Sequence, residues 1–146
     1  MTKQAVARSR ELFDLGWSCS EAVLQAIAES QGVDCRLIPK IATGFGGGLS
    51  HAAGLCGALS GAALGIGLAF GRDAPDQAAD SCYGAVRALW DRFATRFGSD
   101  NCLELTGCHL GTPEGQARFA AENLHARCLE FVATATQLAL ETIARR

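Results

Sequence analysis

The chain has 146 residues, which is enough for one domain whose hydrophobic core needs no cross-links to be stable. Its 13 basic and 15 acidic residues are mixed along the sequence and leave a net charge of −2, so no basic stripe suited to nucleic acid is present. We expect a single domain over residues 1–146 that does not bind nucleic acid.

The apolar segments argue against export and against membrane insertion. The N-terminal sequence MTKQAVARSRELFDLG lacks the apolar segment and the cleavage site of an export signal. The most apolar run, Leu55–Phe70, has 16 residues and four glycines, which is too short to span a bilayer. We therefore expect a cytoplasmic protein that spans no membrane. In that reducing compartment seven cysteines are not a disulfide framework, which leaves metal binding, redox chemistry or burial.

Two helices are predicted near the N-terminus. Thr2 can cap the first, and Gly16 can end it. Ser18 and Glu21 have the spacing of a capping box, in which each side chain bonds a backbone N–H at the helix start. This motif predicts a second helix from about Cys19 to Ser30.

The middle of the chain predicts a glycine-rich loop between helical segments. Pro39 suits the start of a short helical segment that runs into the sequence GFGGG. A helix then begins near Leu55 and ends at Gly71. Pro75 suits the first turn of a long helix that reaches Phe97 and is closed by the glycine that follows it.

Further helical stretches complete the chain. Asp100 can cap a brief turn that holds Cys102. Thr112 and the proline after it open another stretch, which breaks near Asn123. The tail, residues 124–143, keeps apolar residues at helical spacing. Because helix formers dominate and no β-branched run occurs, the sequence predicts an all-α fold, a compact helical bundle.

Several cysteines coincide with predicted helix starts. Cys19, Cys56 and Cys102 fall in the first turn of a predicted helix, and Cys128 is a fourth candidate. Unpaired N–H groups and the positive dipole end at a helix N-terminus stabilise a thiolate, which predicts a lowered thiol pKa and a better nucleophile or metal ligand. The alternative is that each cysteine is a small buried hydrophobe, which the absence of any CxxC spacing favours when they are taken singly.

Glycines recur after Cys56. Gly57, Gly61 and Gly65 are spaced four apart, so they line one face of the helix that follows Cys56. Glycine disfavours a helix by roughly 0.8–1.0 kcal/mol relative to alanine, so the repetition implies a requirement for space. Either two helices pack closely there, or Gly57 and Gly61 let backbone and partner helices close around the sulfur of Cys56.

Four segments together resemble a known family. They read GWSCSEAVL, GFGGGLSHAAGLCGALSGA, FGSDNCLEL and RCLEFV, and they occur in this order over nearly the whole chain. The arrangement is similar to the C-GCAxxG-C-C family of small bacterial and archaeal redox-active proteins, with a CGAxxG pattern at the central cysteine. The resemblance implies a redox role for the four matched cysteines, which are Cys19, Cys56, Cys102 and Cys128. The three others have no counterpart in the family: Cys35, Cys82 and Cys108. Burial is the simplest role of Cys82, Cys35 is a loop or helix-start residue, and the loop position of Cys108 leaves open that it reaches the site.

Three functions remain open for the four matched cysteines, which we expect to lie in one neighbourhood. They can ligate an iron–sulfur cluster for electron transfer or redox sensing. They can act without metal as catalytic thiols in thiol–disulfide exchange. The third alternative is a zinc-stabilised interaction module without redox activity. The resemblance favours the redox class, as an oxidoreductase or an electron carrier, and leaves open both the redox partner and a homodimer.

Two histidines are further candidates for this site. His51 lies in the glycine-rich loop five residues before Cys56 and can act as an additional metal ligand or a proton acceptor, although a lone loop histidine is more often exposed to solvent. His125 lies three residues before Cys128, a spacing that places both side chains on one helical face.

Overall fold

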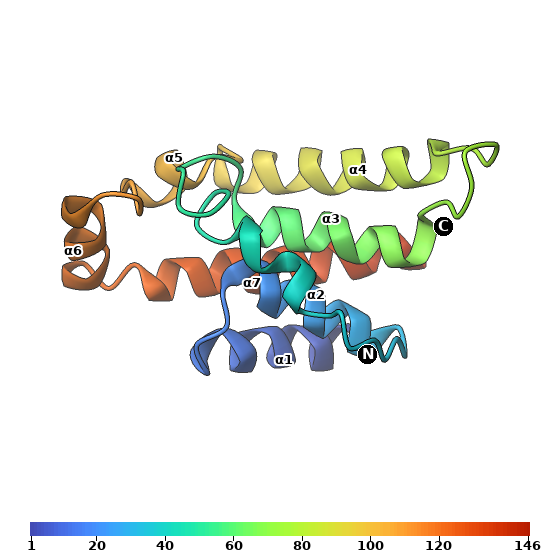
Figure 1. Cartoon of the computed structure of the whole chain (residues 1–146), viewed down its shortest axis with the longest axis horizontal. Coiled ribbons are helices and arrows are strands. Elements are labelled where there is room, and N and C mark those ends of the chain that lie inside the picture. The colour runs from blue at the N-terminus through green and yellow to red at the C-terminus, as the bar shows by residue number, and fades with distance from the viewer.

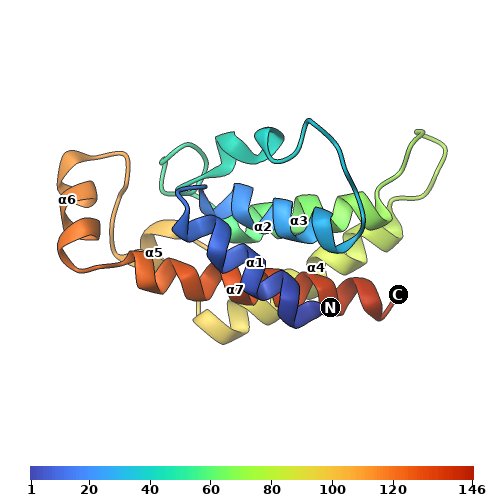
Figure 2. The same cartoon turned by 90° about the horizontal axis from the view of Figure 1, so that it is seen from below.

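The computed structural model describes residues 1–146 and shows an all-α protein (Figure 1). The elements are α1 (Thr2–Asp14), α2 (Cys19–Ser30), the 3-10 helix η1 (Lys40–Phe45), α3 (Gly57–Phe70), α4 (Asp80–Phe97), α5 (Cys102–Thr106), α6 (Pro113–Ala121) and α7 (His125–Ala144). Helix α7 runs along the length of the molecule and contacts α1, α2, α3 and α4, with α4 and α1 at opposite edges in the view of Figure 1. Helices α2 and α3 lie side by side, as the view from below in Figure 2 shows. Helices α5 and α6 lie together at one end.

The core forms where α7 meets the other long helices. Phe131, Ala135 and Leu138 of α7 recur at helical spacing and are buried, as are Ile27 of α2 and Phe93 of α4. A stripe of this spacing on a 20-residue helix gives one continuous apolar face, which explains why α7 contacts α1, α2, α3 and α4. No helix in the structure combines the length and the apolar character that crossing a bilayer requires.

Helices α2 and α3 are in backbone contact. A Cβ on Gly61 would overlap the carbonyl oxygen of Ser20, and a Cβ on Gly65 would lie 2.8 Å from the side chain of Ile27. Ser20 is itself buried and donates a hydrogen bond to the carbonyl of Ala42 before η1 ends. The packing explanation of the glycine spacing therefore holds for Gly61 and Gly65.

The capping motifs predicted several boundaries well. Helix α2 has the predicted bounds, and Ser18 and Glu21 form both hydrogen bonds of the capping box. Helix α4 ends at Phe97, where Gly98 adopts the left-handed conformation with φ +79°. The chain also breaks at Asn123, which has φ +52° and separates α6 from α7.

Other boundaries differ from the predictions. Thr2 is the first residue of α1 and not its cap, which is Met1. Helix α4 begins at Asp80 and not at Pro75, because the guanidinium of Arg72 donates to the carbonyls of Pro75 and Gln77 and holds this segment in a turn.

The cap of α5 is Asn101 and not Asp100. The Asn101 side chain accepts the N–H of Glu104, whereas the carboxylate of Asp100 accepts the indole N–H of Trp90 at 2.8 Å. The backbone carbonyl of Asp100 is used as well, because it accepts the N–H of Cys56. A long-range partner from α4 therefore displaces Asp100 from the capping position.

A cysteine-lined cavity as the candidate functional site

A short antiparallel bridge brings Cys56 and Cys102 together. Leu55 pairs with Asn101, the N–H of Cys56 donates to Asp100, and the N–H of Cys102 donates to the carbonyl of Gly54 at 2.7 Å. Because side chains alternate along paired extended segments, the two cysteines that follow the bridged residues point to the same side. Each then begins a helix, Cys56 as the N-cap of α3 and Cys102 as the first residue of α5.

Cys19 joins this pair from the start of α2. A Cβ on Gly57 would overlap the Sγ of Cys19 and lie 2.9 Å from the carbonyl oxygen of Phe45, so the sulfur rests on the backbone immediately after Cys56. The backbone groups of Gly47 and Ala58 act to lower the pKa of this thiol, against the larger effect of burial. Gly57 is therefore a close-approach position for a sulfur atom, in contrast to Gly61 and Gly65.

Cys128, in the first turn of α7, completes the group. Cys19, Cys56, Cys102 and Cys128 all line one cavity of about 290 Å³. The rest of the wall is largely apolar and includes three aromatic rings from α1, α6 and α7, which are Phe13, Phe119 and Phe131. Sequence reasoning missed these rings, because nothing in the local sequence around them refers to the cysteines. The fold thus brings four cysteines from four helices to one cavity.

The loop between η1 and Cys56 has an unusual backbone. Residues 47–51 all have positive φ, and three of them, Leu49, Ser50 and His51, are not glycine. Non-glycine residues in this region are strained, and such strain gathers at functional sites. The tight path is needed here, since a Cβ on Gly48 would lie 2.8 Å from the Cβ of Cys102. The loop therefore lies against the cysteines, with Gly47 in the cavity wall beside Cys19.

Burial raises the thiol pKa values, so the predicted lowering at helix N-termini is wrong. Burial, followed by the charge of Cys19, raises the pKa of Cys56 to about 12 and that of Cys102 to about 11. Burial also raises the pKa of Cys19 and of Cys128. The backbone N–H groups act in the predicted direction, but desolvation of the thiolate outweighs them. Without a bound cation the four thiols are neutral at neutral pH.

This direction of the pKa shifts predicts a loss of stability in alkali for the metal-free protein. Thiols in the unfolded chain lose their protons near the ordinary pKa of 9.0, whereas Cys102 and Cys56 hold theirs to about 11 and about 12. Above about pH 9 the unfolded state binds fewer protons, so the free energy of unfolding falls as the pH rises. Urea titrations between about pH 8 and about pH 11 measure this fall, which Cys102→Ser will reduce. An unchanged urea midpoint over this range contradicts the burial of the thiols.

The two histidines occupy different positions. His51 lines the cavity, is exposed, and lies with its ring against Gly47, where a Cβ would overlap it. His125 is directed elsewhere: its Nε2 pairs with the carboxylate of Asp14 at 2.9 Å, and its ring stacks on Phe13 with the centroids 4.4 Å apart. No three cysteine, histidine or carboxylate side chains lie close enough together to bind one metal ion in the structure.

The three unmatched cysteines lie outside the cavity wall. Cys35 is exposed, and Cys82 is partly buried against the core. Cys108 is only 1% exposed, and its proximity contributes to the raised pKa of Cys102. All seven cysteines are free thiols.

Comparison with known proteins adds one match. The model of the family described as "Putative redox-active protein (C_GCAxxG_C_C)" matches residues 17–142. The match includes all four cavity cysteines and the whole glycine-rich loop. No curated protein and no solved structure matches the chain.

Proposed function

Because the chain belongs to the C_GCAxxG_C_C family of redox-active proteins, we propose that it carries an iron–sulfur cluster and transfers electrons or senses redox state through it. The ligands in this proposal are Cys19, Cys56, Cys102 and Cys128. The observation that carries the proposal is that these four thiols line one largely apolar cavity. A cluster in this cavity would exchange one electron at a time with a partner.

The charge balance of the cavity supports a cationic occupant. The thiols raise one another's pKa, and burial raises it further, so four thiolates do not coexist in the cavity alone. Binding to a metal deprotonates a thiol outright and supplies the positive charge that the cavity lacks. Soft thiolate ligands in a set of four suit iron–sulfur clusters or zinc.

The spacing of the side chains favours a cluster over a single zinc ion. One zinc ion needs its sulfur ligands at about 2.3 Å, and no three side chains are arranged closely enough for one metal ion. The cavity of about 290 Å³ has the volume of several atoms, since one water takes up about 30 Å³ of the liquid.

The protein would tune such a centre through its backbone and its aromatic wall. The backbone groups of Gly47 and Ala58 act to lower the pKa of Cys19, and those of Ala58 and Leu59 act to lower the pKa of Cys56, so they favour negative charge on these two sulfurs. Hydrogen bonds to ligand sulfurs and the exclusion of solvent set the reduction potential. Phe13, Phe119 and Phe131 are placed to exclude water from the cavity.

A second candidate is thiol–disulfide exchange between Cys19 and Cys56. The sulfur of Cys19 rests on Gly57, next to Cys56, and both thiols are free. Oxidation of the two thiols would form one S–S bond and pass two electrons and two protons to an acceptor such as another disulfide. The raised pKa of both thiols slows attack by a thiolate at neutral pH, so this candidate ranks below the cluster.

Protein purified without oxygen distinguishes these functions. We expect iron and inorganic sulfide in equal amounts and a broad visible absorbance that reductant bleaches and oxidant restores. A metal-free protein whose mass falls by two hydrogens on mild oxidation supports thiol–disulfide exchange instead. A colourless protein that contains zinc and no reversible redox change contradicts both redox functions.

A further inference from the structure

One face of α3 is apolar and only partly covered. The helix has no charged residue, and Ser60 is its one polar side chain. A helix that is apolar on all sides is ordinarily buried on all sides. Here the arc formed by Ala63, Leu64, Gly67 and Leu68 is only partly covered, and Leu68 is 39% exposed.

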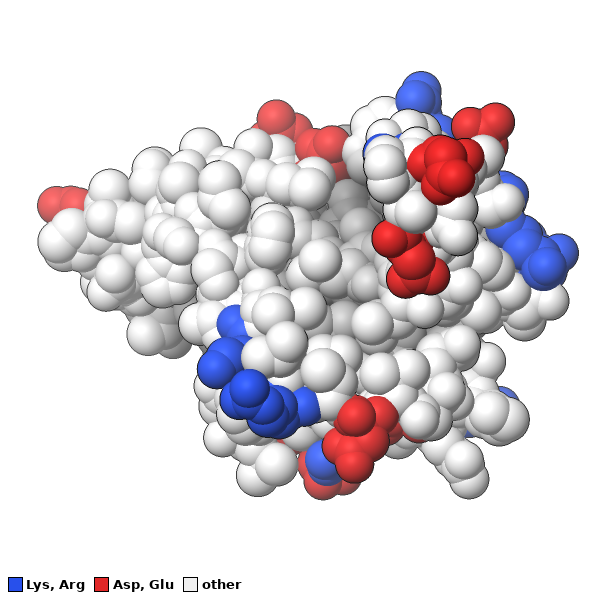
Figure 3. Space-filling view, turned by 45° about the vertical axis from the view of Figure 1, so that its right-hand side comes forward, with Lys and Arg blue, Asp and Glu red and all other residues white.

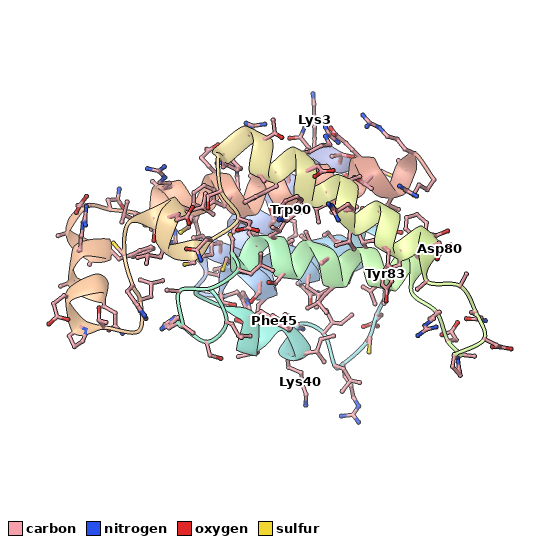
Figure 4. The ribbon with its side chains drawn as sticks, turned by 90° about the horizontal axis from the view of Figure 1, so that it is seen from above. Lys3, Lys40, Phe45, Asp80, Tyr83 and Trp90 are labelled. Atoms are coloured by element: carbon pink, nitrogen blue, oxygen red, sulfur yellow. The ribbon has the colours of Figure 1, made fainter.

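Large apolar side chains extend this face on both sides of α3. Tyr83 and Trp90 of α4 flank it on one side and Phe45 of η1 on the other (Figure 4), and Tyr83 is 71% exposed. Ile41 of η1 is also exposed. We call the arc of α3 together with Phe45, Tyr83 and Trp90 the α3 face. Contiguous apolar surface rich in tyrosine and tryptophan is typical of protein–protein interfaces.

Gly67 leaves room for a close approach to this face. Gly61 and Gly65 are explained by contact with α2, but a Cβ on Gly67 would have no atom of the chain within 4 Å. The residue lies inside α3, does not have positive φ, and is less favourable there than alanine. Nothing within the chain requires a glycine at this position, and the space beside it is open to a close contact from outside.

We infer that a second copy of this chain covers the α3 face in a symmetric homodimer. Helix packing places a ridge of side chains on one helix into a groove on the other. The α3 face has both features side by side: Ala63 and Gly67 form a groove, and Leu64 and Leu68 form a ridge. In a two-fold contact the ridge of each copy packs into the groove of the other, which is what an isologous interface requires.

The charges around the face fit self-association. Lys40 and Asp80 lie at its margins, on opposite sides of α3 (Figure 4), and Arg87 lies over the ring of Trp90. None of the three forms an ion pair within the chain. From another side, Figure 3 also shows Lys, Arg, Asp and Glu side chains of both signs mixed on a largely uncharged surface. A surface with both signs pairs with a copy of itself, whereas an anionic membrane selects clustered basic residues.

Sedimentation equilibrium of the wild-type protein, of two variants of the α3 face and of one control variant tests the dimer. At about 100 µM chain we expect a mass twice the 15.3 kDa of the monomer. Gly67→Glu places a charge in the interface, and its Cβ has no atom of its own chain within 4 Å, so it will weaken dimerisation at least tenfold with the helix content unchanged. The control, Ala7→Glu, makes a comparable change at an exposed position of α1 and will remain dimeric. Tyr83→Glu tests the same face from α4 and will also give monomers.

Three results overturn the inference. The first is a wild-type protein that stays monomeric at this concentration. The second is a dimer that persists in both Gly67→Glu and Tyr83→Glu, which places the contact elsewhere. The third is a monomer that binds vesicles of phosphatidylglycerol and loses this binding in Gly67→Glu, which makes the α3 face a membrane-binding surface. None of these results depends on the iron content, so the dimer and the cluster are tested separately.

Discussion

Cys56→Ser will abolish iron and sulfide binding and leave the helices intact. Serine nearly keeps the volume of cysteine but replaces a soft, ionisable sulfur with a hard oxygen that stays protonated. Cys56 is 6% exposed, and its backbone N–H donates a hydrogen bond to the backbone carbonyl of Asp100. The substitution leaves that bond in place. We therefore expect loss of the visible absorbance with an unchanged circular dichroism spectrum.

Cys82→Ala is the matched control for this experiment. Cys82 packs partly buried on the core and is not in the cavity wall, so its removal will leave iron, sulfide and redox behaviour intact. The stability loss will be modest, because alanine deletes one partly exposed sulfur. Full redox behaviour in Cys56→Ser, or loss of iron in Cys82→Ala, would contradict the assignment of the site to the cavity cysteines.

Local sequence motifs predicted the elements whose boundaries are set by neighbouring residues. The capping box at Ser18 and Glu21 sets the start of α2. Helix α4 ends at Gly98 because this residue adopts the left-handed backbone conformation, which requires no other side chain. The start of α4 and the cap of α5 depend instead on side chains that reach across loops, namely Arg72 and Trp90. Such contacts leave no trace in the local sequence, which is why Pro75 and Asp100 were mistaken for helix starts.

The same distinction applies to the cavity. The motif order selected the four cysteines that line it, and the start of α2 at Cys19 follows from the local capping box. The direction of the pKa shifts of the cavity cysteines does not follow from local sequence, because it depends on how much water the fold removes from each sulfur. The aromatic wall was missed for a related reason, since Phe119 belongs to α6, far from any cysteine motif.

Two of the glycines after Cys56 make different contacts, one with a cavity cysteine and the other with helix α2. A methyl group on Gly57 would overlap the sulfur of Cys19, whereas a methyl group on Gly61 would overlap the backbone of Ser20. Gly57→Ala therefore displaces a proposed ligand, and Gly61→Ala separates α2 from α3. Two substitutions of the same size, four residues apart on one helix face, thus act on different parts of the structure.

We expect Gly57→Ala to lose the cluster and Gly61→Ala to keep it at reduced stability. Overpacking at Gly61 will lower the free energy of unfolding by about 1–3 kcal/mol, of which the better helix propensity of alanine returns up to about 1 kcal/mol. Iron per folded chain and urea denaturation measure the two effects separately. If Gly57→Ala instead binds iron fully and Gly61→Ala does not, the glycines serve helix packing alone. In that case the contact between the Cys19 sulfur and Gly57 is not needed for iron binding. Displacing a true cluster ligand would change the cluster site.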